Sequence, residues 1–188
     1  IRDIGYSLNT AVADIIDNSI SAEAKNIDIH IKNEEGDVSL AIIDDGIGLE
    51  ESQLISAMRL GSRNPLEERD LNDLGRFGLG MKTASFSQCR RLTVVSVIGN
   101  IKSGTQWDLD RIAKTDEWNL SVLDSSEIKK LYQIENLGEN GTLILWENCD
   151  RIIDTTSEGM EVYYEKLRSL EGHLKLVFHR FFVNKKIK

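Results

Sequence analysis

The sequence has little of what marks several common protein classes. It contains 2 cysteines and 1 proline among 188 residues, and its 3 histidines form no H-E-x-x-H pattern. Two distant cysteines supply neither a disulfide framework nor a zinc site, and a single proline argues against a long disordered linker. Apolar runs stay short of the roughly 20 residues that a membrane helix needs. We therefore expect a folded cytoplasmic domain with reduced cysteines and no membrane partner.

Positive charge is scarce as well. The chain carries 23 Lys and Arg against 31 Asp and Glu, which gives a formal net charge of −8 at pH 7. Nucleic-acid surfaces depend on clustered Lys and Arg, so we expect no nucleic acid to bind this chain itself. What is present is an ordinary globular composition, 40% hydrophobic and 29% charged, in a length that suits one core.

The order of periodic segments predicts an α+β fold. Apolar residues recur at helical spacing in 6–24 and 50–60, whereas 27–32 and 38–43 read as strands around a turn at Gly36. We expect a two-layer α/β sandwich in which helices cover one face of a mixed sheet. A further helix is expected to end at about residue 89, and others are expected at 125–135 and 157–180. Further strands are expected at 92–98, 104–109, 118–124 and 142–147.

The two ends of the chain predict how its domains are arranged. The sequence opens on Ile1 rather than on methionine, and residues 181–188 read as a strand that has just begun. We therefore expect residues 1–180 to form one domain, and residues 181–188 to start a following domain of a larger protein.

A cluster of glycines is the most informative stretch. Gly75, Gly78 and Gly80 are spaced G-x-x-G-x-G, with Phe77 and Leu79 between them, directly before a predicted helix. Glycine lets a loop backbone approach a ligand closely, and a helix start offers unpaired N–H groups and a positive dipole end. Together these features favour an anion site, most often for phosphate.

Lys82 adds a cation beside this loop, although a flexible loop alone explains such glycines about as often. The P-loop pattern G-x-x-x-x-G-K-[ST] is absent. The order G-x-x-G-x-G after a loop does not match the Rossmann fingerprint either. Residues 61–74 are polar and aperiodic, which is typical of a lid or a binding loop.

Asp14 and Asn18 form a second candidate site. They are four residues apart in the first predicted helix, so they neighbour each other on its polar face. A carboxylate beside an amide oxygen suits a water molecule and a hard cation such as magnesium. The alternative is a solvated polar face without function.

A third patch follows the strand at 38–43. Asp44 ends that strand, and Gly46 and Gly48 continue as G-x-G, so a carboxylate could bind a base edge while the glycines let the ring lie close. The alternative is a plain turn, because Asp-Gly is a common turn signal. A fourth, weaker patch is Gly141 with Thr142 at the start of a later strand.

At these patches the chain resembles the GHKL superfamily, which comprises DNA gyrase, heat-shock chaperones, histidine kinases and MutL proteins. Asp14–Ala22 resembles the N box, Asp44–Gly48 the first glycine box, Gly75–Gly80 the second, and Gly141-Thr142 the late G-T element. Four motifs in order are far more specific than one, and the match spans about residues 6–147. It is closest to the hydrolase branch with the Morc and MutL ATPases and the heat-shock chaperones. The resemblance implies a Bergerat-type fold that holds ATP between helices and sheet, under a lid.

The resemblance also implies roles for single residues in the adenine and metal sites. Asn18 matches the magnesium ligand, and Asp44 matches the carboxylate that accepts a hydrogen bond from the adenine amino group. Gly46 and Gly48 match the glycines beside adenine and ribose. Thr142 matches the residue whose hydroxyl helps to fix the adenine.

For the phosphates, the resemblance implies binding by the backbone of the second glycine box. Its members here are Gly75, Phe77, Gly78, Leu79 and Gly80, and Lys82 is expected to contact a phosphate. The ATP lid is expected over residues 61–76, which include Arg63 and Arg76.

One position departs from the family pattern where catalysis is expected. The hydrolase branch usually has glutamate four residues before the magnesium ligand, and here that residue is Asp14, which is shorter by about 1.5 Å. A displacement near 1 Å can slow a reaction on the order of a hundredfold. Ser21 also stands where many relatives carry aspartate.

We therefore expect a magnesium-dependent ATP-binding domain whose Asp14 polarises water for slow hydrolysis, coupled to lid closure and dimerisation. One alternative is an ATP-gated clamp that does not hydrolyse ATP. The other is a histidine-kinase catalytic domain, a branch that usually has asparagine at the position of Asp14.

Overall fold

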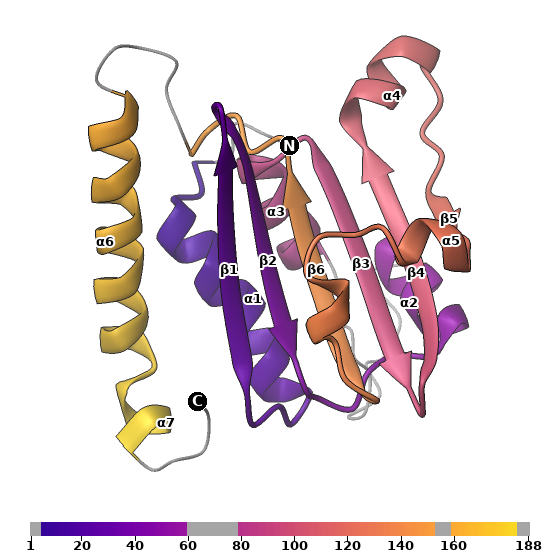
Figure 1. The fold of residues 1–188 in the computed structure, drawn as a ribbon, viewed down its shortest axis with the longest axis horizontal. Coiled ribbons are helices and arrows are strands. Elements are labelled where there is room, and N and C mark those ends of the chain that lie inside the picture. Colours follow the sequence, from indigo (N-terminus) through magenta and orange to yellow (C-terminus); the bar gives the residue numbers. More distant parts are fainter. Residues whose placement is uncertain (1–4, 60–78, 153–158, 184–188) are drawn as a thin grey trace, which may run out of the picture.

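The computed structural model describes residues 5–59, 79–152 and 159–183 (Figure 1). Among the helices of these ranges, none combines the length and apolarity that crossing a bilayer requires. The helices are α1 (Leu8–Ser21), α2 (Glu51–Met58), α3 (Leu79–Gln88), α4 (Leu109–Thr115), α5 (Ser125–Ile128), α6 (Gly159–Val177) and α7 (His179–Val183), with a 3-10 helix, η2 (Ile134–Asn136).

One six-stranded sheet organises the described chain, in the order β1-β2-β6-β3-β4-β5. The α+β fold class is confirmed, but the prediction of a mixed sheet was wrong, because every described pairing is antiparallel. β2 and β3 are joined through helices and run in the same direction, yet β6 lies between them and is antiparallel to both. The strands are β1 (Ile27–Glu34), β2 (Asp37–Asp44), β3 (Arg91–Ile98), β4 (Ile101–Asp108), β5 (Ser121–Leu123) and β6 (Gly141–Glu147).

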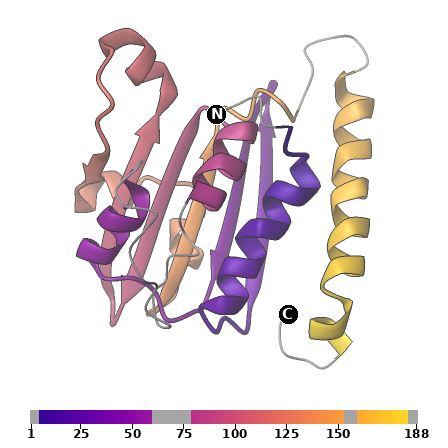
Figure 2. The same ribbon diagram turned by 180° about the vertical axis from the view of Figure 1, so that it is seen from behind.

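Helices α1, α2 and α3 cover one face of the sheet (Figure 2). The opposite face is covered by the shorter segment that contains α5 and η2. α6 packs beside α1 near the β1 edge, and α7 follows it. The layer of α1 and α3 on the sheet is the part of the fold that positions the candidate site.

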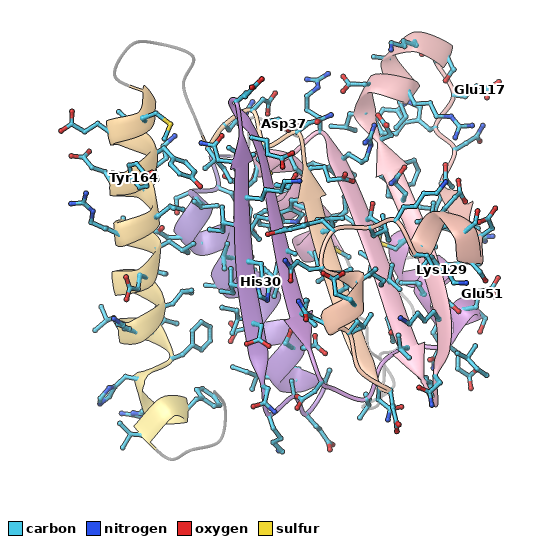
Figure 3. The ribbon with its side chains drawn as sticks, in the orientation of Figure 1. His30, Asp37, Glu51, Glu117, Lys129 and Tyr164 are labelled. Carbon is cyan, nitrogen blue, oxygen red and sulfur yellow. The ribbon has the colours of Figure 1, made fainter. Side chains whose placement is uncertain are left out.

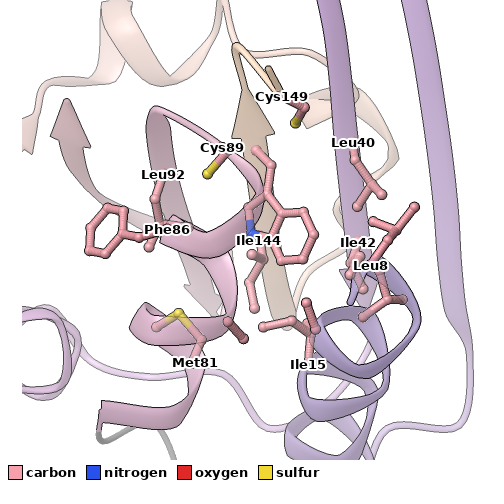
Figure 4. Close-up of a cluster of buried hydrophobic side chains, with 14 of the residues drawn as sticks. Leu8, Ile15, Leu40, Ile42, Met81, Phe86, Cys89, Leu92, Ile144 and Cys149 are labelled. Carbon is pink, nitrogen blue, oxygen red and sulfur yellow. The ribbon is translucent and has the colours of Figure 1, made fainter. Parts of the chain in front are cut away.

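The core between helices and sheet explains why α1 and the central strands form where they do. Leu40 of β2 and Ile144 of β6 belong to one buried cluster with Ile15 of α1 and Phe86 of α3, between the helices and the sheet (Figure 4). Trp146 is fully buried there, and its indole N–H donates to Ser85 Oγ at 2.9 Å. This close packing fixes the helix layer against the sheet.

The β1–β2 hairpin shows the alternation that predicted it. Ile27, Ile29 and Ile31 pack against the helix-side core, so His30 between them faces the other side of the sheet (Figure 3). The turn at Gly36 joins the two strands, as the sequence predicts, with Glu34 paired to Asp37.

Several boundaries differ from the sequence prediction, and the single helix expected over 125–135 is replaced by the short helix α5 and the separate 3-10 helix η2. The strand expected over 104–109 ends at Asp108, because the Asp108 carboxylate accepts hydrogen bonds from the N–H groups of Asp110 and Arg111 and so caps α4. The strand expected from Phe181 is wrong for the described part, because this residue lies in helix α7. Its ring centroid is 6.3 Å from that of Phe178, and residues 184–188 lie outside the described ranges.

Candidate functional site

A cavity of about 560 Å³ lies where α1 meets the first turn of α3. α1 contributes its polar face, α3 contributes its start, and α7 contributes one aromatic ring. The lining residues are Asp14, Asp17, Asn18, Ile20, Ser21, Gly80, Met81 and Phe181. The cavity therefore brings residues of two predicted motifs, the N box and the second glycine box, to one place.

The amphipathic pattern of α1 orients its polar residues toward this cavity. Ser7 caps the helix by accepting a hydrogen bond from the Thr10 N–H at 3.1 Å. Ile15 and Ile16 are buried in the core, so Asp14 and Asn18, one turn apart, lie on the cavity side. The predicted neighbourhood of these two residues is thus present in the structure.

Asp14 has a close neighbour that the motifs do not contain. Tyr6 lies close enough to Asp14 for the negative charge of that carboxylate to raise the pKa of the Tyr6 phenol above its ordinary value, with burial and hydrogen bonding to Asp14 as smaller causes.

Ser21 lies in the cavity wall where many relatives carry aspartate. Its hydroxyl donates to the backbone oxygen of Asp17 at 2.7 Å, within the same helix. The substitution removes one negative charge from the cavity and keeps a polar side chain.

Asp44 is a buried carboxylate at the end of β2, with 5% of its surface exposed. Ser19 Oγ donates to its Oδ2 at 2.7 Å, and the Gly46 N–H donates to its Oδ1 at 3.0 Å. The Thr142 N–H is a further donor. Burial raises the pKa of Asp44, and these hydrogen bonds oppose the rise. The carboxylate is thus held in one orientation in a desolvated position.

The glycines near Asp44 are required by close backbone contacts. Gly48 has φ of +71°, and a Cβ there would lie 2.3 Å from the Val97 oxygen. Gly141 has φ of +132°, and a Cβ would lie 1.9 Å from the Asp44 oxygen. A Cβ on Gly46 would lie 2.7 Å from the Ala22 oxygen. Because these glycines have no side chain, β2, β3, β6 and the end of α1 can approach one another closely. This packing requires glycine whether or not a ligand binds.

Ser96 of β3 joins the residue that follows the first glycine box to the late G-T element. Its Oγ accepts from the Leu49 N–H at 2.7 Å and donates to the Gly141 oxygen at 3.2 Å. Thr142 Oγ1 lies 3.5 Å away. Sequence reasoning missed this residue, although a serine within the apolar run of β3 was a visible signal.

The side chain of Lys82 points toward the end of α2 in this structure. Its buried amine donates to the backbone oxygens of Ala57 at 2.7 Å and Arg59 at 2.5 Å, at the end of α2. Burial lowers the pKa of this amine. The expected contact of Lys82 with a phosphate stays a prediction.

The second glycine box is described only at its end. Gly80 lies exposed in the first turn of α3, and Leu79 begins that helix. Gly75, Phe77 and Gly78 lie outside the described residues, as do the predicted lid residues Arg63 and Arg76. Their predicted roles stay predictions.

The donor set in the cavity fits a hard cation that is completed by other oxygens. Asp14 and Asn18 offer a carboxylate and an amide oxygen on one wall. Within the described ranges, no group of three or more His, Cys, Asp or Glu could hold a metal ion alone. Magnesium usually keeps water or phosphate oxygens in its coordination shell. Asn18 and the phosphate oxygens of a nucleoside triphosphate could therefore bind it together.

Comparison with known proteins identifies the family. The model of the histidine kinase-, DNA gyrase B- and HSP90-like ATPase family matches residues 6–142, and the chain belongs to this family. The resemblance to the GHKL superfamily is thereby confirmed, together with its Bergerat-type fold. Membership supports ATP binding, and members of the family such as the MORC proteins are ATPases.

Three curated relatives illustrate the match. The DNA mismatch repair protein MutL of Buchnera aphidicola subsp. Schizaphis graminum is 31% identical over 103 residues, which cover 54% of this chain and 17% of MutL. The mouse ATPase MORC2B is 31% identical over 78 residues, 40% of this chain and 8% of MORC2B. The chaperone protein HtpG of Aliarcobacter butzleri is 27% identical over 135 residues, 60% of this chain and 21% of HtpG. The match thus covers less than a quarter of each relative.

Proposed function

We propose that this chain is a magnesium-dependent ATP-binding domain that hydrolyses ATP slowly. The observation that carries the proposal is the shared cavity, in which Asp14 and Asn18 face the start of α3 at Gly80. Family membership supports ATP as the ligand. The cavity brings a carboxylate, an amide oxygen and the first turn of a helix to one place, and we propose that these serve as base, metal ligand and phosphate site.

In the proposed complex, adenine binds at the end of β2. Asp44 accepts a hydrogen bond from the adenine amino group, and Thr142 fixes the base through its hydroxyl. Gly46 and Gly48 have no side chains, so the adenine ring and the ribose can lie close to the backbone there. The support for this placement is that Ser19 and the Gly46 N–H already hold the Asp44 carboxylate in one orientation.

The phosphates bind at the start of α3, where unpaired N–H groups and the helix dipole favour negative charge. Gly75, Gly78 and Gly80 let the loop backbone reach the phosphates, with Phe77 and Leu79 between them. Lys82 adds a contact if its amine leaves the end of α2. Magnesium, held by Asn18 and the triphosphate, would neutralise charge that develops during phosphoryl transfer.

Asp14 is the proposed catalytic residue. Its carboxylate orients and polarises the water that attacks the terminal phosphate. Aspartate reaches about 1.5 Å less far than glutamate, which is why we propose a slow rate.

The cycle is proposed to act on a larger protein. Residues 61–76 would close over bound ATP as a lid, and closure would favour an ATP-dependent homodimer. Since the match covers less than a quarter of each relative, other domains of a larger protein would use the motion. Cys89 and Cys149 are buried and form no disulfide bond, which suits a reducing cytoplasmic setting.

Two measurements on the intact protein test this proposal. Titration calorimetry with ATP, in magnesium and in chelator, is expected to show binding that magnesium strengthens. Single-turnover phosphate release is expected to show slow hydrolysis. ATP binding without hydrolysis would favour the gated clamp, which the short Asp14 side chain supports. Acid-labile phosphate on the protein would favour the histidine kinase.

A further inference from the structure

We infer that Ser96 is a positioning residue for adenine recognition, because its hydroxyl fixes the loop after Asp44 relative to the backbone at Thr142. Ser96 lies in β3 and belongs to none of the four motifs. The inference rests on the proposed function, since it needs Asp44 and Thr142 to contact the adenine. It deepens that proposal by naming the residue that sets their relative position.

The Ser96 hydroxyl contacts two segments that lie far apart in the chain. It is fully buried, and its Oγ accepts a hydrogen bond from the Leu49 N–H at 2.7 Å. The same hydroxyl donates to the Gly141 oxygen at 3.2 Å, and Thr142 Oγ1 lies 3.5 Å from it. One atom of β3 therefore contacts the residue after the first glycine box and both residues of the late G-T element.

The strand register places Ser96 in one row with the proposed adenine contacts. Thr142 of β6 is paired with Asp44 of β2 on one side and with Ser96 of β3 on the other. Residues that pair directly across strands share a face of the sheet. Val94, two residues before Ser96, belongs to the core cluster on the helix side, so the row faces the helices. All three side chains of the row are buried.

The Leu49 N–H depends on this serine. Leu49 is buried, and Ser96 Oγ accepts the hydrogen bond from its N–H. A buried donor that loses its acceptor is unfavourable. Removal of the hydroxyl should therefore shift the loop that joins Asp44 to Leu49, and with it the Asp44 carboxylate relative to Thr142.

Close backbone contacts would carry such a shift between the strands. A Cβ on Gly48 would lie 2.3 Å from the Val97 oxygen, and a Cβ on Gly141 would lie 1.9 Å from the Asp44 oxygen. Closely packed interiors transmit small displacements rather than absorb them. The end of β2 and the start of β6 are thus expected to keep their relative position only while Ser96 joins them.

The adenine edge is the part of the nucleotide that should respond. Asp44 and Thr142 are proposed to contact the same rigid ring, so their separation must match that ring. The phosphates are proposed to bind elsewhere, at the start of α3. A shift between Asp44 and Thr142 should therefore weaken the contact with the adenine amino group and leave the phosphate contacts unchanged.

The test is titration calorimetry on the intact protein with two nucleotides, ATP and purine riboside triphosphate, which is ATP without the amino group of the base. We expect wild type to bind ATP at least about tenfold more tightly than the analogue, the effect of one hydrogen bond to a charged group. Ser96→Ala should weaken ATP binding about tenfold and binding of the analogue by less than about twofold, because its effect passes through the amino-group contact. Circular dichroism checks folding.

Ser96→Cys is the second variant, which decides the test if Ser96→Ala does not fold. Its thiol has a similar shape but is a weak donor and a weak acceptor, so the same selective loss of ATP affinity is expected.

Thr93→Val is the matched control. Thr93 is a fully buried residue of the same strand, and its Oγ1 accepts from Gln106 Nε2 at 2.8 Å. It shares the opposite face of the sheet with Val95, away from the proposed adenine site. Removal of its hydroxyl should leave the affinities for both nucleotides unchanged.

Three results would overturn the inference while the proposed function stands. One is a folded Ser96→Ala protein with wild-type affinity for ATP. Another is an equal loss for ATP and for the analogue, and the third is failure of both Ser96 variants to fold; either would mean a purely structural role. If wild type binds ATP no better than the analogue, the proposed adenine contact fails and the inference fails with it, which wild type alone reveals.

Discussion

Ser19 Oγ donates a 2.7 Å hydrogen bond to Oδ2 of Asp44 and so joins helix α1 to the end of strand β2. Both side chains are buried, Ser19 with 2% of its surface exposed and Asp44 with 5%. The bond connects the N box to the first glycine box, which lie 25 residues apart in the chain. The proposed adenine and metal sites are therefore linked by one helix, with Asn18 and Ser19 adjacent on it.

Asp44→Asn should lower ATP affinity by at least about a hundredfold, because a site built around a specific hydrogen-bond acceptor loses much when a donor replaces it. The amide would face the donors Ser19 and Gly46. Calorimetry with ATP checks this, and circular dichroism confirms folding. Asp28→Asn, at an exposed position of β1, is the control that should bind normally. A folded Asp44→Asn protein with wild-type affinity would remove Asp44 from the adenine site.

Ser19→Ala should weaken ATP binding by roughly tenfold, the low end of the about 1.5–3 kcal/mol that a hydrogen bond to a charged group contributes, because it acts on ATP only through Asp44. The expected cause is an Asp44 carboxylate that is free to turn. Ser39→Ala, on β2 away from the site, is a matched control. Nucleotide titration of both variants decides the matter, and equal affinities would show that the bond has no part in binding.

Asn18→Ala should weaken ATP binding in magnesium much more than in chelator, because the lost amide oxygen is a proposed ligand of the metal. The measurement is ATP affinity under the two conditions. The exposed Asn119 offers the control Asn119→Ala, whose magnesium dependence should equal that of wild type. If magnesium dependence survives in Asn18→Ala, the ligand lies elsewhere.

Gly48→Ala should lower the free energy of unfolding by about 2 kcal/mol or more, because φ is positive there and a Cβ would lie 2.3 Å from the Val97 oxygen. Gly80→Ala is the contrast, since among the described residues nothing lies within 4 Å of its Cβ position and it lies in the first turn of α3. Its effect on stability should stay within about 1 kcal/mol. Urea denaturation without nucleotide measures both, and similar values would show that the close contact at Gly48 relaxes.

Local sequence patterns predicted most of the helices and strands. They could not predict the order of the strands, which depends on long-range pairing. The alternation in β1 and β2 and the turn at Gly36 predicted the hairpin that the structure contains. The place of β6 between β2 and β3 was not predictable, because strand order depends on partners distant in sequence. The expectation of a mixed sheet failed for this reason.

The candidate site, like the fold, could be predicted from the sequence only in part. The spacing of Asp14 and Asn18 predicted their shared face, because a helix repeats every 3.6 residues. The contacts of Ser19 and Ser96 were missed, because each depends on an element that only folding brings near. Lys82 likewise reads as a phosphate contact in sequence, while its amine binds the end of α2 in the structure.

Steady-state phosphate release by wild type, Asp14→Asn and Asp14→Glu, with ATP binding measured in parallel, tests the central claim most directly. Asp14→Asn should keep ATP affinity within a few-fold and lose most hydrolysis, because an amide cannot accept the proton from water. Asp14→Glu should hydrolyse ATP at least as fast as wild type, because it restores the reach found in the hydrolase branch. Equal rates for wild type and Asp14→Asn would contradict the account and make the ATP-gated clamp the better description.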